Sequence, residues 1–389
     1  MRPRCQPPSL GSSNAYLVDV KVGGKFADDR IYNHNLDILQ RVARGNCVLK
    51  LSGLGAPRHL CLVHALRKFT GSVGDEDDTA DVGDDATWRR YFLRPPGAAA
   101  RLVVTHKVDG DAAHLSARWL DGGFLVCVGS KNVHLVLRRE ADIELYRANG
   151  YQVAKQAAAA AWRQLAALGP ERRRQLLSFL HHTRFTAVCE LLQPEHQHVE
   201  DFSHLTRGEL RFIAWAPPLE SAGEAAASLC GCSPELGFRL ADVFGLTTVT
   251  YSVVTGDVEE QLPDVVLEVR KAYGFEGKVL YFVDSDDNVI GMLKKKTVWY
   301  VMLRSSSVAL GKHSINDLRS KISARLRSIQ ASMCLTDEFI EKWIDLSVAF
   351  AIWRMDLGRE VKGVALPQLW ARFLRQSGCT DRFPVGIGR

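Results

Sequence analysis

The chain has 389 residues, of which 46% are hydrophobic and 24% charged, so it has enough apolar material for one large or two ordinary globular domains. No apolar run approaches the roughly 18 residues of a membrane span, which excludes a transmembrane protein. The formal charge of +6 permits an anionic partner without requiring one.

Nine scattered cysteines and the lack of a signal-peptide pattern predict a reduced intracellular location, cytoplasmic or nuclear. Cys230-Gly-Cys232 is too close a pair to form a zinc site alone, and the histidines at 181, 182, 196 and 198 fit no common zinc-ligand spacing. Residues 1–14 are expected to be a disordered tail, with a weak organelle-targeting segment as the alternative.

The first part of the chain is predicted to be rich in strands. Strands are expected at residues 16–22, 48–51, 60–63 and 101–106, with a short helix at 35–43. The acidic segment from Asp75 to Asp85 predicts a solvated surface loop. Two further runs, 113–119 and 124–128, flank Asp121-Gly122-Gly123 and predict a hairpin.

The remaining chain alternates between predicted helices and strands. Helices are expected at 142–168, 171–181, 224–229, 234–244 and 258–273, and strands at 186–192, 209–215, 278–283 and 289–293. From Ile315 onward only helical periodicity remains, with helices ending near Ile329, Met355 and Gln376. This pattern predicts an α+β domain at residues 15–307 and an all-helical domain at 308–389.

The stretch Thr105-His106-Lys107-Val108-Asp109-Gly110 is the first candidate functional motif. An apolar strand delivers Lys107, and an Asp-Gly turn follows at once. One interpretation is a nucleophilic lysine that takes a nucleotide onto its side-chain nitrogen. The alternative is a solvated lysine at a strand end, which is the commoner case for such a short pattern.

Two carboxylates could act with this lysine. Glu190 is a single acidic residue inside an apolar strand, where burial is costly unless the carboxylate has a partner. Glu276 stands at the turn before a predicted strand, in Phe275-Glu276-Gly277. The alternatives are an edge-strand glutamate that faces water and a plain helix-to-strand connection.

Further lysines could supply positive charge. In Lys294-Lys295-Lys296, strand alternation places Lys294 and Lys296 on one face and Lys295 on the other. Ser130-Lys131 follows the predicted hairpin. Exposed strand lysines and a solvated lysine after a turn are the alternatives.

These groups match what lysine-based nucleotidyl transfer requires. A free lysine has a pKa of about 10.4 and is protonated at neutral pH, so desolvation and nearby cations are expected to lower the pKa of Lys107. Lys294, Lys296 or a metal ion would supply that field and neutralise the α-phosphate as pyrophosphate leaves.

In order and spacing, the motifs resemble the covalent nucleotidyltransferases, and most of all the RNA ligases of the T-even phage, tRNA-repair type. The matching elements are Lys107–Gly110, Ser130-Lys131, Phe185–Pro194 with Glu190, Glu276–Val279 and Lys294–Val301, together with upstream Ala43-Arg44-Gly45 and Arg67-Lys68-Phe69. Asn132 departs from the family, which usually has glycine after Ser-Lys. The resemblance covers residues 40–305 and implies an ATP-grasp-like nucleotidyltransferase domain of antiparallel sheets with flanking helices.

The resemblance also implies roles for the matching residues. Lys107 would carry AMP, Glu190 would bind the ribose, and Glu276 would act in catalysis and, with Asp109, hold Mg²⁺ or Mn²⁺. Lys294 and Lys296 would contact the α-phosphate. Arg44 and Lys68 would bind the outer phosphates of ATP, and Lys131 would orient the RNA. In the helix from residue 313, which no family motif covers, basic residues including Arg319 and Lys321 would suit RNA phosphates.

The implied function is an ATP-dependent RNA ligase that seals 5′-phosphate and 3′-hydroxyl ends through a lysyl-AMP intermediate and an adenylylated RNA end. Its partners would be RNA ends, with tRNA as one candidate, and separate end-healing enzymes. The alternatives are a guanylyltransferase of the mRNA-capping type and an RNA-binding relative without turnover.

Overall fold

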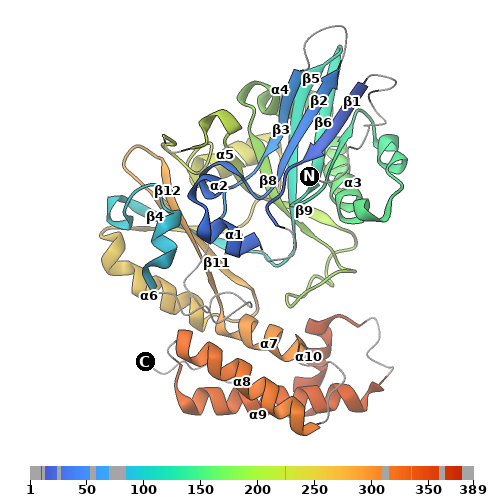
Figure 1. Cartoon of the computed structure of the whole chain (residues 1–389). Helices are drawn as coiled ribbons and strands as arrows, with labels where there is room; N and C mark the ends of the chain where they lie inside the picture. Colours follow the sequence, from blue (N-terminus) through green and yellow to red (C-terminus); the bar gives the residue numbers. More distant parts are fainter. Residues whose placement is uncertain are drawn as a thin grey trace.

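The computed structural model describes residues 10, 14–23, 28–52, 58–69, 85–223, 225–308, 315–333, 335–358 and 364–378. Within these ranges three antiparallel sheets and their covering helices form one region, and a group of helices lies beside it (Figure 1). The predicted α+β class with antiparallel sheets and a C-terminal helical region is confirmed. Most of the predicted tail and most of the acidic loop fall outside the described residues, but Asn14, the last residue of that tail, begins a strand.

The first sheet has the order β1-β2-β3. It consists of β1 (Asn14–Asp19), β2 (Asn46–Ser52) and β3 (Arg58–His64). Two short helices, α1 (Asp28–His34) and α2 (Leu36–Arg41), connect β1 to β2. The side chain of Asn35 caps α2 by accepting a hydrogen bond from the Ile38 N–H at 3.0 Å, which explains why the helix begins there.

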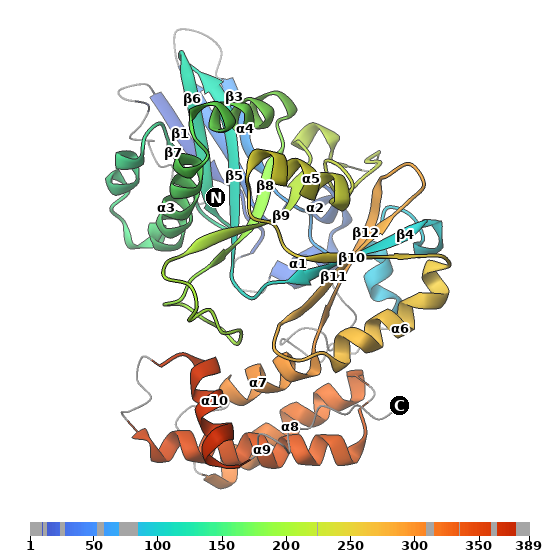
Figure 2. The same ribbon diagram turned by 180° about the vertical axis from the view of Figure 1, so that it is seen from behind.

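The second sheet has the order β7-β6-β5-β8-β9. Its strands are β5 (Asp111–Leu120), β6 (Gly123–Ser130), β7 (His134–Leu137), β8 (Thr186–Leu192) and β9 (Glu209–Ala216). The β5–β6 hairpin turns through Asp121 and Gly122, both with positive φ (49° and 77°), as a two-residue type I′ turn requires. Helices α3 (Gln152–Ala167), α4 (Pro170–Thr183) and α5 (Pro234–Phe244) cover one face of this sheet (Figure 2).

The third sheet has the order β10-β4-β11-β12. It contains β4 (Arg101–Lys107), β10 (Tyr251–Thr255), β11 (Gly277–Val283) and β12 (Val289–Lys296), and α6 (Val258–Lys271) packs against it. A core cluster between the sheets joins Leu49 of the first sheet, Val188 of the second and Val103 of the third. The three sheets therefore share one hydrophobic core.

The C-terminal helices have a core of their own. They are α7 (Val298–Val308), α8 (Ile315–Met333), α9 (Asp337–Asp356) and α10 (Leu366–Gln376). Residues 298–303 of α7 pack with the apolar faces of α8 to α10 in one cluster rich in aromatic rings. The domain boundary near residue 307 remains a prediction. Within the described residues, no helix has both the length and the apolar character that a membrane crossing needs.

Two predicted helices differ from the structure. The helix expected at 142–168 begins only at Gln152, because residues 140–151 form two short 3₁₀ helices, Glu140–Leu145 and Asn149–Tyr151. The helix expected at 224–229 is wrong for the described residues 225–229. There the Leu229 N–H donates to the Val289 carbonyl of β12 instead of to a preceding turn. Strands β7 and β10 were not predicted.

Candidate active site

The candidate site is organised by a row of residues that crosses three strands of the third sheet. Lys107, the last residue of β4, pairs with Gly277 of β11, and Gly277 pairs with Lys296 of β12. Directly paired residues project to the same face of a sheet, so Lys107 and Lys296 lie on one face. Lys294, two residues before Lys296, shares that face, and Lys295 lies on the opposite one, as predicted.

Glu276 connects the two lysines of this row. Its Oε2 accepts a hydrogen bond from Lys107 Nζ at 2.5 Å, and its Oε1 lies 3.8 Å from Lys296 Nζ. The Glu276 side chain is 6% exposed. Glycine is needed next in the chain, because a Cβ on Gly277 would overlap the main-chain oxygen of Lys295. The close approach of β11 and β12 therefore fixes where Glu276 enters the site.

Glu190 approaches Lys107 from the second sheet. It lies on β8 and pairs with Ala112, just after the turn that follows Lys107. The chain passes so close to β8 here that a Cβ on Gly110 would overlap the Leu191 carbonyl oxygen. The Asp109-Gly110 element is thus required by packing against the strand that carries Glu190, and it brings the two sheets together at the lysine.

The charges of Lys107 and the carboxylates are strongly coupled. Burial disfavours the lysine cation, but the negative charges of Glu276 and Glu190 outweigh it and raise the pKa of Lys107 above its ordinary value. The predicted lowering of this pKa is therefore wrong in the structure. Burial raises the pKa of Glu190 to about 8, against the opposing effect of the Lys107 cation. A change in the protonation state of either group therefore changes the pKa of the other.

Asp109 is buried and fully engaged within the protein. Its Oδ2 accepts hydrogen bonds from the N–H groups of Val199 (2.8 Å) and Glu200 (3.2 Å), and its Oδ1 accepts one from the Tyr300 hydroxyl (2.9 Å). Only 3% of the residue is exposed. This arrangement ties the turn after Lys107 to the segment 199–200 and to α7. It favours a positioning role for Asp109 over the expected role as a metal ligand.

Glu200 is a site residue that the sequence did not single out. Its Oε1 accepts a hydrogen bond from the Glu276 N–H at 2.5 Å and lies 3.7 Å from His106 Nε2. The residue is 5% exposed. Its position in a loop after β8 carries no periodic signal, and a lone Glu-Asp pair there would have given no reason to choose it.

The predicted phosphate-binding cations gather in a second cluster. Arg44 and Lys131, 87 residues apart in the sequence, both bind the Asp28 carboxylate of α1, at 2.9 Å and 2.6 Å. The buried Lys68 lies near enough for its charge to contribute to the lowered pKa of Lys131, for which burial is the main cause. Asp28 was not predicted, because nothing in its local sequence distinguishes it from a solvated acid.

Arg319 and Lys321 lie apart from the sheets, on α8 of the C-terminal helices. Arg319 forms an ion pair with Asp345 of α9 at 2.9 Å, and both side chains are more than half exposed. Lys321 is also exposed. The core contacts of α8 are with α7, α9 and α10, so the structure does not bring these two cations into the clusters around Lys107 and Arg44.

Among the described residues, three sets have the chemistry to hold a metal ion. Glu190 and Glu276 offer carboxylate oxygens beside Lys107, the donor type that Mg²⁺ and Mn²⁺ prefer. Asp19, Cys47 and His134 form a second group, and Asp111, His196 and His198 form a third. Within each of these two groups the ligand atoms all lie within 4.8 Å of one another. The two histidines were considered in the sequence, but Asp111 is 85 residues from His196 and only the fold places it there.

Comparison with solved structures finds RNA ligases at low identity. An archaeal ATP-dependent RNA ligase, form 1, is 12% identical with a TM-score of 0.45, over 86% of this chain and 78% of that chain. Form 2 is 11% identical with a TM-score of 0.45, over 90% and 87%. A Naegleria gruberi RNA ligase with PPi is 14% identical with a TM-score of 0.35, over 53% and 52%.

No curated protein matches the chain. One family model does match, over residues 4–307, which include all three sheets and the cluster around Lys107. The chain therefore belongs to the family described as Domain of unknown function (DUF7920).

Proposed function

We propose that this protein is an ATP-dependent RNA ligase of the covalent nucleotidyltransferase type. The observation that carries the proposal is the Lys107–Glu276 pair, held 2.5 Å apart within a row that also contains Lys296 and faces Glu190. A solvated lysine at a strand end needs no such surroundings. The order of motifs, which resembles T-even phage RNA ligases, supports the same reaction class.

In the first step, Lys107 Nζ attacks the α-phosphorus of ATP. The lysine first loses an ammonium proton, and the Glu276 carboxylate is in contact to accept it. The nitrogen lone pair forms a P–N bond, the bond from the α-phosphorus to the bridging oxygen breaks, and pyrophosphate leaves with that electron pair. Lys294 and Lys296, on the same face, offset the charge that builds on the phosphate oxygens.

Other residues position the nucleotide. Glu190 would hold the ribose, since its carboxyl group can accept hydrogen bonds from hydroxyls and, with a pKa of about 8, also donate one near neutral pH. Arg44, Lys68 and Lys131 would contact the outer phosphates of ATP or the RNA end. The Asp28 carboxylate forms ion pairs with Arg44 and Lys131, so a phosphate that binds these two cations would have to compete with it.

Glu190 and Glu276 would hold a divalent cation, Mg²⁺ or Mn²⁺, through carboxylate oxygens beside Lys107. The cation would require Glu190 to give up the proton that its raised pKa retains near neutral pH, and the charge of the cation favours that loss. Such a cation supplies positive charge that favours the neutral amine and offsets phosphate charge. Asp109 would act through its hydrogen bonds by keeping the Lys107 turn in place.

The next two steps would seal RNA. An oxygen of the RNA 5′-phosphate attacks the adenylyl phosphorus, the P–N bond breaks, and Lys107 regains a proton. The 3′-hydroxyl of a second end then attacks that 5′-phosphorus, loses its proton and releases AMP. The substrates would be RNA ends, with tRNA as a candidate, prepared where necessary by separate end-healing enzymes in an intracellular compartment.

Nucleotide labelling tests the proposal directly. Incubation with α-labelled ATP and Mg²⁺ should leave acid-labile label on the wild-type protein and none on Lys107→Ala. Lys278→Ala is the matched control, because Lys278 lies one residue from Gly277 on the opposite face of β11. Absence of wild-type label, or label on Lys107→Ala, contradicts the proposal. Labelling by GTP in place of ATP would instead indicate a capping-type guanylyltransferase.

A further inference from the structure

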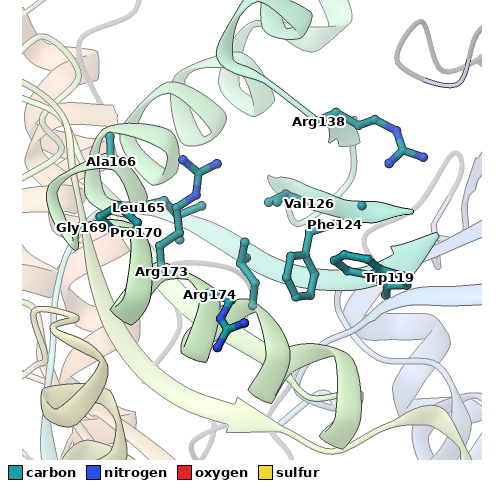
Figure 3. A pocket seen from close by; sticks show the side chains of 12 residues that line it. Trp119, Phe124, Val126, Arg138, Leu165, Ala166, Gly169, Pro170, Arg173 and Arg174 are labelled. Carbon is teal, nitrogen blue, oxygen red and sulfur yellow. The ribbon is translucent and has the colours of Figure 1, made fainter. Parts of the chain in front are cut away.

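A cavity of about 690 Å³ lies on the helix-covered face of the second sheet (Figure 3). The β5–β6 hairpin, the end of β7 and helices α3 and α4 form its walls. Val126, on its floor, packs in the cluster beneath those helices, whereas Val188, on the same face of β8 as Glu190, packs in the cluster between the sheets. The cavity is therefore separate from the candidate active site, on the other side of the sheet.

Two aromatic rings form part of the cavity floor. Trp119 and Phe124 are directly paired across the hairpin, with ring centroids 4.8 Å apart and planes at 86°. Trp119 is 51% exposed, although tryptophan side chains are on average highly buried in folded proteins. An exposed indole beside a second ring is a suitable platform for a stacked nucleobase.

Three arginines surround the aromatic floor, and two of them are held in place. Arg138 donates from both terminal nitrogens to the Leu120 carbonyl oxygen, at 3.1 Å each. The Arg173 guanidinium lies 4.7 Å from the centroid of the Trp162 ring. Arg174 is 73% exposed and lies 3.6 Å from Glu171, a surface pair that contributes little. The cavity thus combines apolar ring faces with oriented cations.

The start of α4 carries three consecutive arginines after a single acidic residue, Glu171. The helix begins Pro170-Glu171-Arg172-Arg173-Arg174, and no side chain caps it. Cations near a helix N-terminus oppose the positive end of the helix dipole. Gly169 and Pro170 also line the cavity, so this end of the helix adds to the positive potential there. Such an arrangement is stabilised when an anion binds.

We propose that this cavity binds one nucleotide unit of single-stranded RNA, with the base stacked on Trp119 and the flanking phosphates bound by arginine. Arg138 lies on one side of Phe124, and Arg173 and Arg174 lie on the other (Figure 3). A base within a strand has a phosphate on each side, whereas a mononucleotide has phosphate on only one. Positive charge on both sides of the rings therefore favours a nucleotide within an RNA chain over a free mononucleotide.

This inference deepens the proposed function, on which it rests, because it gives the ligase a second contact with its RNA outside the active site. RNA bound there is held to the opposite face of the sheet that carries Glu190. The contact would increase RNA affinity without taking part in adenylyl transfer.

Fluorescence anisotropy with a labelled oligoadenylate of about 20 nucleotides tests the cavity. Trp119→Ala should weaken binding by about fivefold or more, because base–aromatic stacking contributes on that scale. Arg174→Gln should weaken binding and lower the slope of log affinity against log salt by about 0.7, the value for one phosphate contact of a single strand. Arg239→Gln, the same change at an exposed position of α5 outside the cavity, should leave both quantities unchanged.

The inference is overturned if Trp119→Ala and Arg174→Gln bind the oligonucleotide as Arg239→Gln does. A second measurement follows the fluorescence of Trp119 in the presence of an added quencher. The inference is also overturned if AMP protects this fluorescence and the oligonucleotide does not, since the ligand would then be a mononucleotide. ATP labelling of Lys107, measured on the same proteins, should be unaffected by all three changes. Loss of wild-type labelling with cavity-dependent RNA binding intact would contradict the ligase proposal and leave the cavity assignment standing.

Discussion

Gly110 lies against Glu190 so closely that a Cβ added to the glycine would fall 2.9 Å from Glu190 Cγ. The turn after the candidate nucleophile and the strand that carries the candidate ribose-binding residue are thus fitted to each other. Gly110 therefore serves the turn and also limits the distance between two functional groups on different sheets.

Replacement of Gly110 by alanine is therefore expected to damage the site. The methyl group would overlap the Leu191 carbonyl oxygen, so the turn or β8 must shift, at a cost of about 1–3 kcal/mol in the free energy of unfolding. ATP labelling of Lys107 should fall by about tenfold or more, since a shift of about 1 Å suffices for such losses. Gly150→Ala, where nothing lies within 4 Å of the new methyl group, is the control and should retain both stability and labelling.

Glu190 should give the protein a pH-dependent stability that a glutamine cannot. Its pKa in the folded state is about 8, above that of an unfolded glutamate, so the folded state binds the extra proton. Stability from this group is therefore greatest at low pH and falls as the pH rises from about 4.5 to about 8. Denaturant unfolding across this range should show Glu190→Gln gaining stability relative to wild type as pH rises; a constant difference would contradict the assigned pKa.

The three lysines that end β12 should separate into two classes. Lys294→Ala and Lys296→Ala remove cations from the face of Lys107 and should reduce sealing of a 5′-phosphate RNA end by about tenfold or more. Lys295 projects to the other face and is only 5% exposed, so Lys295→Ala should lower the melting temperature but preserve labelling of the folded protein. Gel-based joining and thermal melts distinguish these outcomes. Full activity of Lys294→Ala and Lys296→Ala would refute the face assignment.

Tyr300 should stabilise the lysine turn from α7. Its hydroxyl donates to the buried Asp109 Oδ1 at 2.9 Å, and Tyr300→Phe would leave that oxygen without this donor. The expected loss is about 1.5–3 kcal/mol, the range for hydrogen bonds to charged groups, measured by urea unfolding. Tyr251→Phe, at a 42% exposed tyrosine, should change stability by less than about 0.5 kcal/mol.

Asp28 should make stability fall at acid pH. Hydrogen bonds and charge from Lys131 and Arg44 overcome the effect of burial and lower its pKa to about 2. Stability from a carboxylate with a lowered pKa is present above about pH 4 and is lost as the pH falls through about 2. Asp28→Asn should cost about 1 kcal/mol at pH 7, less than the full pKa shift implies because solvent screens part of the interaction, and the difference should shrink towards pH 2. Asp264→Asn, at an exposed position of α6, should show no such convergence.

Local sequence predicted those parts of the fold that follow from residue spacing. The alternation along residues 294–296 placed two lysines on one face because side chains in a strand point to opposite sides in turn. Turn residues located the β5–β6 hairpin, and helical periodicity located α4, α5 and α8 to α10, but not α7. The helix expected before Gln152 failed because spacing alone does not show where a regular helix begins. Strand β10 was missed although Tyr251–Thr255 is rich in strand-favouring residues, because the segment is short and its exposed side chains show no alternation of apolar and polar positions.

By itself the sequence determined the order of the candidate motifs and which residues could carry chemistry: Lys107, Glu190, Glu276 and the lysines of β12. The tertiary structure alone decided their partners. It placed Glu200 on the Glu276 N–H, Asp28 between Arg44 and Lys131, and Tyr300 on Asp109. These contacts join residues 16 to 191 positions apart, so no local period encodes them. The sequence predicted a lowered pKa for Lys107. In the folded protein the charges of Glu276 and Glu190 raise that pKa instead, and only the tertiary structure brings both carboxylates to the lysine.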